Sequence, residues 1–232
     1  MSRTKAITQS KIAILTAVVA AILLLFAVPR LLVSIVTAPS AVVLRELQNQ
    51  EPVTFEELET IVRAQRRGLF FVNDGRLYTD LGLAELLMAE RLSADHADVN
   101  QHLENAVRAL KEGLAVAPGN PYAWARLAYA EARLRGWTPV ALSSLRLALL
   151  TAAFEPRLLW SRLRLGFLAW SHMTVEDQEI MFQQIRTAWE ENPTELARLA
   201  RDLGRVDVVR TALLRFPHAD DELQELLKSL PS

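Results

Sequence analysis

The chain has 232 residues, 51% of them hydrophobic and 23% charged, which excludes a disordered chain because enough apolar surface is available to offset the entropy lost on folding. It contains no cysteine, which excludes disulfide bonds, zinc thiolate sites and thiol nucleophiles. Residues 1–37 hold four basic side chains and no acid, so the remainder carries 22 bases against 27 acids, and this mildly acidic balance argues against a nucleic-acid partner.

The first element is an apolar segment near the amino terminus. Residues 12–28 carry no charge, and the apolar run resumes over residues 31–36. Because about 20 apolar residues cross a hydrocarbon core of roughly 30 Å, we predict a transmembrane helix over residues 12–36, preceded by a cytoplasmic tail over residues 1–11. A cleaved signal peptide is the alternative: the segment is longer than the core of such peptides, but Val36-Thr37-Ala38 is a tolerable cleavage sequence.

Basic residues flank this segment unequally. Arg3, Lys5 and Lys11 precede it, whereas Arg30 and Arg45 follow it in the company of acidic residues. Because the more basic flank stays in the cytoplasm, we expect the amino terminus there and everything beyond about residue 38 on the other side. In a bacterial cell this is a single-pass inner-membrane protein with a periplasmic carboxy-terminal domain.

Residues 37–53 are predicted to be a juxtamembrane connector, helical in part, and residues 54–232 to be a helical domain. The first helix of this domain begins with Thr54 and Glu57, which have the spacing of a capping box, and it runs to about Gly68. Three arginines near its end would complement the negative end of the helix dipole. They are Arg63, Arg66 and Arg67.

Nine further helices are predicted from apolar residues at helical spacing and from the turn residues between them. They cover residues 78–92, 100–116, 122–135, 140–153, 158–170, 175–191, 194–203, 206–216 and 220–230. No stretch alternates between apolar and polar residues for long enough to predict a strand. The predicted fold class is therefore all-α.

An internal repeat links the middle helices. The sequence Trp124-Ala125-Arg126-Leu127 recurs as Trp160-Ser161-Arg162-Leu163, 36 residues later, and each copy follows a turn that contains proline. A period in the thirties is typical of proteins in which each repeat is a pair of packed helices.

The residues around this repeat resemble the tetratricopeptide repeat. The resemblance is carried by Trp124, Leu127, Ala128, Gly136, Trp137, Ala141, Ala148 and Pro156. Units that open at Tyr78 and Trp160 would flank this one, so the resemblance covers about residues 75–193, with Glu131 and Arg164 as departures from the motif. It implies one transmembrane helix followed by a TPR-like α-solenoid of antiparallel helix pairs. In layout alone, the chain also resembles membrane-anchored accessory proteins of polysaccharide biosynthesis and export.

The resemblance further implies a partner-binding groove on the inner face of the array. Its residues would be Arg76, Thr79, Leu83, Leu87, Tyr122, Ala125, Tyr129, Arg133, Leu158, Ser161, Leu165 and Ala169. An apolar groove edged by tyrosine and arginine suits an amphipathic helix or an extended peptide of a protein partner. The alternative is that a helix of the same chain, either residues 55–67 or the last helix, fills the groove.

The sequence lacks the common catalytic and metal-binding motifs. It has no Gly-rich phosphate loop, no Gly-x-Ser-x-Gly and no His-Glu-x-x-His. His96 and His102 lie six residues apart across a predicted helix start, which is poor geometry for a shared metal, and His172 and His218 are distant in sequence. We therefore expect no catalytic residue, cofactor, metal or small-molecule substrate.

The expected function is that of a non-catalytic, membrane-anchored scaffold or adaptor. It would contact the bilayer through residues 12–36 and bind a protein partner at the membrane through the helical-repeat groove. Envelope or exopolysaccharide assembly is the process that the layout suggests. The alternative is a periplasmic peptide-binding chaperone module, such as those of cytochrome c maturation or outer-membrane assembly.

Overall fold

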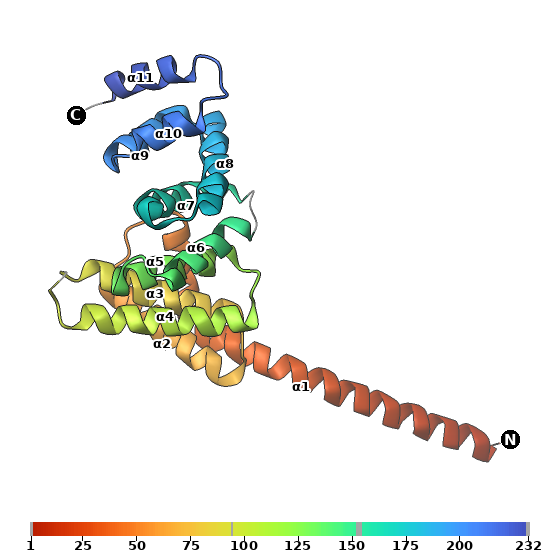
Figure 1. Ribbon diagram of the computed structural model, residues 1–232. Helices are drawn as coiled ribbons and strands as arrows, with labels where there is room; N and C mark the ends of the chain where they lie inside the picture. The colour runs from red at the N-terminus through yellow and green to blue at the C-terminus, as the bar shows by residue number, and fades with distance from the viewer. Residues whose placement is uncertain (1, 94, 152–154, 231–232) are drawn as a thin grey trace.

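The computed structural model describes residues 2–93, 95–151 and 155–230, with side chains from Thr16 onward. Within these ranges the chain forms eleven α-helices and one short 3-10 helix, and it has no strand (Figure 1). The prediction of an all-α fold class is confirmed. The helices are α1 (Ser2–Gln48), α2 (Phe55–Phe71), α3 (Gly75–Arg91), α4 (Asp98–Val116), α5 (Pro121–Arg135), α6 (Pro139–Leu150), α7 (Pro156–Ala169), η1 (Trp170–His172), α8 (Val175–Glu191), α9 (Pro193–Asp202), α10 (Val206–Ala212) and α11 (Ala219–Ser229).

The amino-terminal helix is longer than predicted. It continues past Val36 to Gln48 and contains both Pro29 and Pro39, so most of the segment predicted as a partly helical connector belongs to α1. Figure 1 shows its first half projecting away from the rest of the molecule. The stretch Thr16–Gln48 is long and apolar enough to cross a membrane, and an 18-residue window within it has a mean hydropathy of 2.6. A signal sequence meets the same criterion, so a retained anchor stays a prediction.

The second half of α1 packs against α2, and the two helices run in opposite directions. Gln65 Nε2 donates a hydrogen bond to Ser40 Oγ at 3.1 Å, and about one turn further along α2 Gly68 faces Thr37 and Val33. A Cβ atom on Gly68 would lie only 2.9 Å from Thr37 Cγ2. The absence of a side chain at Gly68 therefore allows the close approach of the two helices.

The capping box predicted at the start of α2 is confirmed. Thr54 Oγ1 accepts a hydrogen bond from the backbone N–H of Glu57 at 3.3 Å, and Glu57 Oε2 accepts one from the backbone N–H of Thr54 at 2.6 Å. These bonds satisfy two amides that a helix start leaves unpaired, and they lower the pKa of the Glu57 carboxyl. The other end of α2 lies at Phe71 instead of Gly68.

The predicted role of the three arginines on α2 is wrong, because none of them lies in the last turn of the longer helix. Arg63 pairs with Glu59 one turn away at 2.9 Å, on the solvent side. Arg66 pairs with Glu85 of α3 at 2.7 Å, which ties α2 to its neighbour. The third arginine, Arg67, is exposed.

Helices α3 and α4 approach closely through glycines. A Cβ atom on Gly75 would lie 2.8 Å from Ala117 Cβ, and one on Gly82 would lie 2.6 Å from Leu110 Cγ. These contacts place the start of α3 against the end of α4, so the two helices run in opposite directions.

Proline fixes the start of four helices. Pro121, Pro139, Pro156 and Pro193 are the first residues of α5, α6, α7 and α9. The fixed φ of proline suits this position, where the missing N–H costs no hydrogen bond. These helices therefore begin one or two residues earlier than predicted, and Pro156 opens a helix instead of closing a repeat. The predicted end, at Ala153, of the helix that starts at residue 140 lies outside the described residues.

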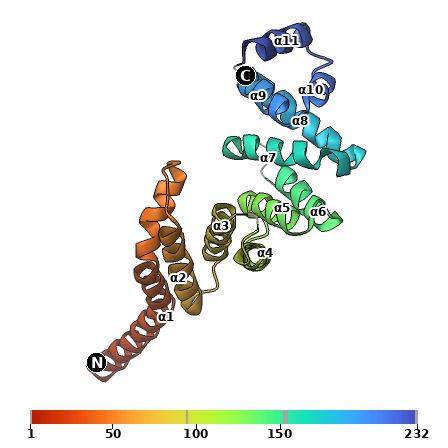
Figure 2. The ribbon, with the colours of Figure 1, turned by 90° about the vertical axis from the view of Figure 1, so that its left-hand side faces the viewer.

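The core follows the helices in three successive clusters of buried side chains. The first joins α1, α2, α3 and α4, the second joins α3, α4 and α5, and the third extends from α5 to α11. Consecutive helices from α1 to α9 pack on one another, and α3 also contacts α5, which in turn contacts α7. Figure 2 shows α3, α5 and α7 following one another along the array.

Candidate functional site

The twelve residues predicted to line a groove lie on α3, α5 and α7. We call the accessible surface that these three helices share the α3/α5/α7 face. Five of the twelve residues are at most 6% exposed and pack inside the array, where a partner would not reach them; these are Thr79, Ala125, Leu158, Leu165 and Ala169. The other seven are accessible. Leu83, Leu87, Tyr122 and Tyr129 are half-buried, and Arg76, Arg133 and Ser161 are exposed.

A row of alternating tyrosine and arginine on α5 forms the centre of this face. The row consists of Tyr122, Arg126, Tyr129 and Arg133, whose spacing of three and four residues places them on one side of the helix. The Arg126 guanidinium carbon lies 6.0 Å from the centroid of the Tyr122 ring, and that of Arg133 lies 5.8 Å from the Tyr129 ring. Arg133 Nη1 also donates to Tyr129 Oη at 3.0 Å. These cation–π and hydrogen-bond contacts order the row.

Acidic side chains on both neighbouring segments face the tyrosines. Burial raises the pKa of the Tyr122 hydroxyl, and a hydrogen bond to Glu155, just before α7, raises it further. Burial also raises the pKa of Tyr129, which bonds to Glu90 of α3. The tyrosines therefore connect α5 to the segments on either side of it.

An electrostatic interaction joins Arg126 of the row to Asp80 of α3, and both side chains are half-buried. Burial raises the pKa of the Asp80 carboxyl, and the positive charges of Arg126 and Arg76 partly oppose that rise. Burial lowers the pKa of Arg126, and the negative charge of Asp80 partly opposes that change. The face is therefore polar and carries both signs of charge, in contrast to the predicted apolar groove.

The α3/α5/α7 face continues toward α1 as a hollow of about 350 Å³. Polar side chains of α1, α2 and α3 line much of it; they are Ser40, Arg45, Gln48, Gln65, Arg76 and Asp80. Arg76 and Asp80 thus belong both to the hollow and to the face. A ligand bound on α3 and α5 would also reach the carboxy-terminal turns of α1.

The alternative that the chain fills its own groove is met only at α3, where Leu87 packs on the cluster that includes α2. Helix α2, which contains residues 55–67, has its main contacts with α1 and α3, and the last helix, α11, packs on α9 and α10. Neither has α5 or α7 among its main contacts in the part of the chain that the structure describes.

The repeated Trp-x-Arg-Leu sequence has a structural role in both copies. Leu127 and Leu163 are 2% and 0% exposed and belong to the core. Arg162 is also fully buried, and its Nη2 donates to the backbone oxygen of Thr151 at 2.8 Å. Burial lowers the pKa of Arg162 as it does for Arg126. The repeated sequence contains Arg126 and could therefore have identified it. The predicted groove did not include this residue.

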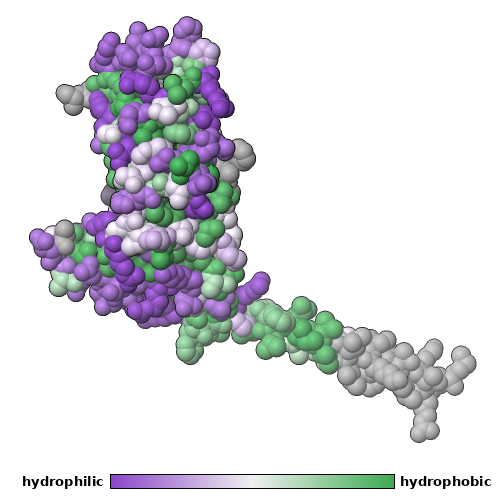
Figure 3. Space-filling model, in the orientation of Figure 1, coloured by the Kyte–Doolittle hydropathy of each residue, from purple (hydrophilic) through white to green (hydrophobic). Residues whose placement is uncertain are grey.

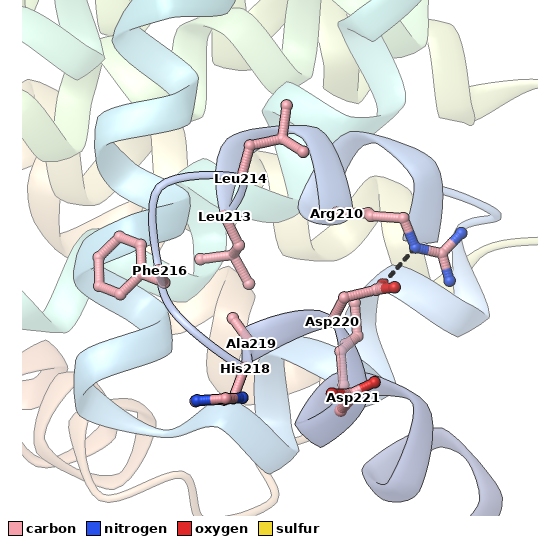
Figure 4. Close-up of a pocket in the computed structure, with 9 residues that line it drawn as sticks. Arg210, Leu213, Leu214, Phe216, His218, Ala219, Asp220 and Asp221 are labelled. Atoms are coloured by element: carbon pink, nitrogen blue, oxygen red, sulfur yellow. Dashed lines mark hydrogen bonds and ion pairs between the residues drawn. The ribbon is translucent and has the colours of Figure 1, made fainter.

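A second hollow, of about 280 Å³, lies between α10 and α11 (Figure 4). Arg210 and Asp220 form an ion pair at its edge. Figure 4 shows that the His218 ring points away from the carboxylates of Asp220 and Asp221. The histidine and the aspartates therefore do not form an acid–base pair in this hollow.

Histidines and carboxylates do not gather elsewhere in the ranges that the structure describes: no three of them lie close enough to hold a metal ion. His96 Nδ1 accepts a hydrogen bond from the backbone N–H of Asp98 at 3.2 Å, at the start of α4. His102 Nδ1 lies 2.7 Å from Glu85 Oε2. The two histidines that are six residues apart therefore have separate partners, and the expectation of no metal or cofactor stays a prediction.

Comparison of the sequence with models of known protein families gives no match, and comparison with curated proteins gives none. The resemblance to the tetratricopeptide repeat therefore depends on the residues quoted above.

Proposed function

We propose that this chain is a non-catalytic, membrane-anchored scaffold that holds a protein partner at the bilayer through the α3/α5/α7 face. The observation that carries the proposal is an unpacked apolar helix at one end of a packed helical array. Every side chain from Thr16 to Leu32 is exposed except Pro29, and Leu25 and Phe26 are 71% and 68% exposed. An apolar surface of this extent is unfavourable in water and marks a membrane or protein contact.

The length of α1 that precedes its packing on α2 fits a bilayer. Residues 12–32 form 21 residues of continuous helix, which at 1.5 Å per residue extends about 31 Å. The hydrocarbon core of a bilayer is roughly 30 Å thick. Packing on α2 begins at Val33, directly after this length. This agreement supports a retained anchor over residues 12–36, as the sequence predicts.

We propose that the amino terminus is cytoplasmic and that the helical domain lies on the other side, which in a bacterium is the periplasm. Support comes from the sequence, in which Arg3, Lys5 and Lys11 precede the span. The side chains of these three residues lie outside those that the structure describes. Envelope or exopolysaccharide assembly is the process that we propose, on the layout of the chain.

We also propose that residues 75–193 form a TPR-like α-solenoid of antiparallel helix pairs. Three features support this arrangement: the opposed directions of α3 and α4, the contacts of α5 with both α3 and α7, and the buried position of Arg162 in the second copy of the repeated sequence. In such an array the first helix of each pair lines one face. That face would contain the tyrosine–arginine row of α5.

The chemistry of the face favours a scaffold over a chaperone. A chaperone for unfolded segments needs exposed apolar surface, and among the large apolar side chains of α3, α5 and α7, all fully described, Leu168 alone is exposed, at 42%. Tyrosine and arginine are instead the residues that most often dominate specific protein interfaces. The mixed charges of Asp80, Arg126 and Arg133 would select a partner with complementary charges.

Photo-crosslinking in membranes tests the proposal. A photoreactive amino acid at Ser161 lies on the α3/α5/α7 face, and the same residue at the exposed Thr187 of α8 is a matched control. We expect one discrete crosslinked protein at position 161, none at position 187, and loss of the crosslink when Tyr129→Ala and Arg133→Ala are combined. Equal crosslinking at both positions, or a crosslink that survives the double substitution, would contradict the proposal.

A further inference from the structure

Two phenylalanines at the end of α2 form an exposed apolar patch. Phe70 is 86% exposed, more than any other large apolar side chain in the part of the chain that the structure describes, and Phe71 is 39% exposed. Their rings meet edge to face, with centroids 5.6 Å apart. Figure 3 shows apolar surface beside α1 where that helix leaves the domain.

The patch lies level with the end of the proposed membrane span. Gly68 faces Val33 of α1, and because α2 runs antiparallel to α1, each later residue of α2 lies about 1.5 Å closer to the amino-terminal end of α1. Val36 lines the same surface hollow as Phe70 and Phe71. The rings therefore lie beside Val36, in a part of α1 whose exposed apolar residues include Leu31, Leu32 and Ile35. The apolar patch thus includes residues of both α1 and the end of α2.

Basic side chains accompany the patch. From Arg66 to Val72 the chain has no acidic residue. Arg66 is paired with Glu85, but Arg67 is exposed and has no ion pair among the described side chains, and Arg30 is exposed on α1. Phenylalanine on an apolar surface with neighbouring arginines is typical of helices that lie in the membrane interface, where the rings are buried at the headgroup–acyl boundary and arginines meet phosphates.

We propose that the end of α2, with Phe70, Phe71 and Arg67, inserts into the bilayer interface as a second membrane contact beside α1. This inference rests on the proposed membrane anchoring of α1. A lipid surface is the occupant because the patch adjoins the apolar surface of α1 and carries charge opposite to anionic headgroups. Two contacts fix the orientation of the domain relative to the membrane, which a single helix leaves free to rotate. The α3/α5/α7 face would then meet its partner at a defined angle.

Site-specific fluorescence in the full-length protein tests this contact. The chain has no cysteine, so a single cysteine at position 70 can carry an environment-sensitive nitrobenzoxadiazole dye. The matched controls are Leu31→Cys, which reports on α1, and Leu214→Cys, which is 79% exposed on the carboxy-terminal part of the array. Each protein is reconstituted into vesicles of phosphatidylcholine and phosphatidylglycerol, with and without lipids that carry a nitroxide on the acyl chain. Circular dichroism verifies that each variant keeps its helix content.

We expect a blue-shifted emission and strong nitroxide quenching at positions 31 and 70, and neither effect at position 214. Quenching at 31 without quenching at 70 would overturn the second contact and leave the anchor in place. A dye that is unquenched at both 31 and 70 would overturn the anchor and with it the inference. Equal quenching at 70 and 214 would show that the whole domain lies on the membrane, which also overturns a specific contact at the end of α2.

Discussion

Arg66 of α2 donates a hydrogen bond of 2.7 Å to Glu85 of α3, whose other carboxylate oxygen lies 2.7 Å from Nδ1 of His102 on α4. The Glu85 side chain is 2% exposed, so both of its oxygens depend on these partners. One carboxylate thus links three helices at the amino-terminal end of the array. A buried carboxylate is stable only when its hydrogen-bonding capacity is satisfied.

Loss of this link should destabilise the domain. We expect Glu85→Ala to lower the free energy of unfolding by about 1–3 kcal/mol, because the hydrogen bonds that join three helices are lost while Arg66 returns to solvent. Urea unfolding in detergent, followed by circular dichroism, measures the change. Glu59→Ala is the control: its partner Arg63 is exposed, and loss of such a surface pair should cost less than about 0.5 kcal/mol. Equal effects of the two substitutions would contradict the role of Glu85.

The glycine contacts between α3 and α4 predict a steric effect. Gly82→Ala would place a methyl group 2.6 Å from Leu110 Cγ, and we expect a loss of about 1–3 kcal/mol from the resulting overpacking. A methyl group on Gly119 would have no described atom within 4 Å, and the φ of Gly119 is not positive, so Gly119→Ala should be neutral or slightly stabilising. Thermal unfolding of both variants compares them. A stable Gly82→Ala variant would show that the two helices can separate at little cost.

The raised pKa of Asp80 predicts a dependence on pH. When the pKa of an acid is higher in the folded state, the folded state binds more protons than the unfolded one, so stability falls as the pH rises through that interval. Burial disfavours the charged form of this carboxylate, and Asp80→Asn removes the cost of that charge. We therefore expect Asp80→Asn to be more stable than the unsubstituted protein at pH 7. The difference should shrink as the pH falls toward the ordinary value of 3.8.

Urea midpoints at pH 7 and at mildly acidic pH measure this difference. The exposed Asp207 gives the control variant Asp207→Asn, which should match the unsubstituted protein at both values. An Asp80→Asn variant that is less stable than the unsubstituted protein at pH 7 would mean that the attraction to Arg126 and Arg76 exceeds the cost of burial.

Local rules were enough to predict most helices of the domain. The capping box at Thr54 and Glu57 and the bounds Val175–Glu191 of α8 follow from residue type and apolar spacing, and both are found in the structure. The continuation of α1 through Pro39 was not predicted, because proline ordinarily interrupts a helix. Here packing of the last turns of α1 on α2 holds the helix together, and that contact is not visible in local sequence.

Only part of the candidate face could be predicted from the sequence. Consecutive side chains of a helix point about 100° apart, so an error of one residue selects a different side of the helix. The α5 row contains Arg126 where the prediction had Ala125, which is buried. On α7 the predicted Leu158, Leu165 and Ala169 point into the core. Phe70 belonged to no predicted element because α2 was expected to end at Gly68. Which side of a helix faces solvent depends on neighbours that are distant in sequence, such as Glu155 for Tyr122.

The orientation of the chain in a membrane is the measurement that tests the account most directly. Single cysteines at Ser2 and at the exposed Leu214 are labelled with a membrane-impermeant maleimide in intact bacterial spheroplasts, and the membranes are then pelleted. We predict labelled Leu214→Cys protein in the membrane pellet, and labelling of Ser2→Cys only after permeabilisation. Labelling at position 2 in intact spheroplasts, or a labelled domain that is found in the soluble fraction, would contradict a retained anchor with the helical array outside the cytoplasm.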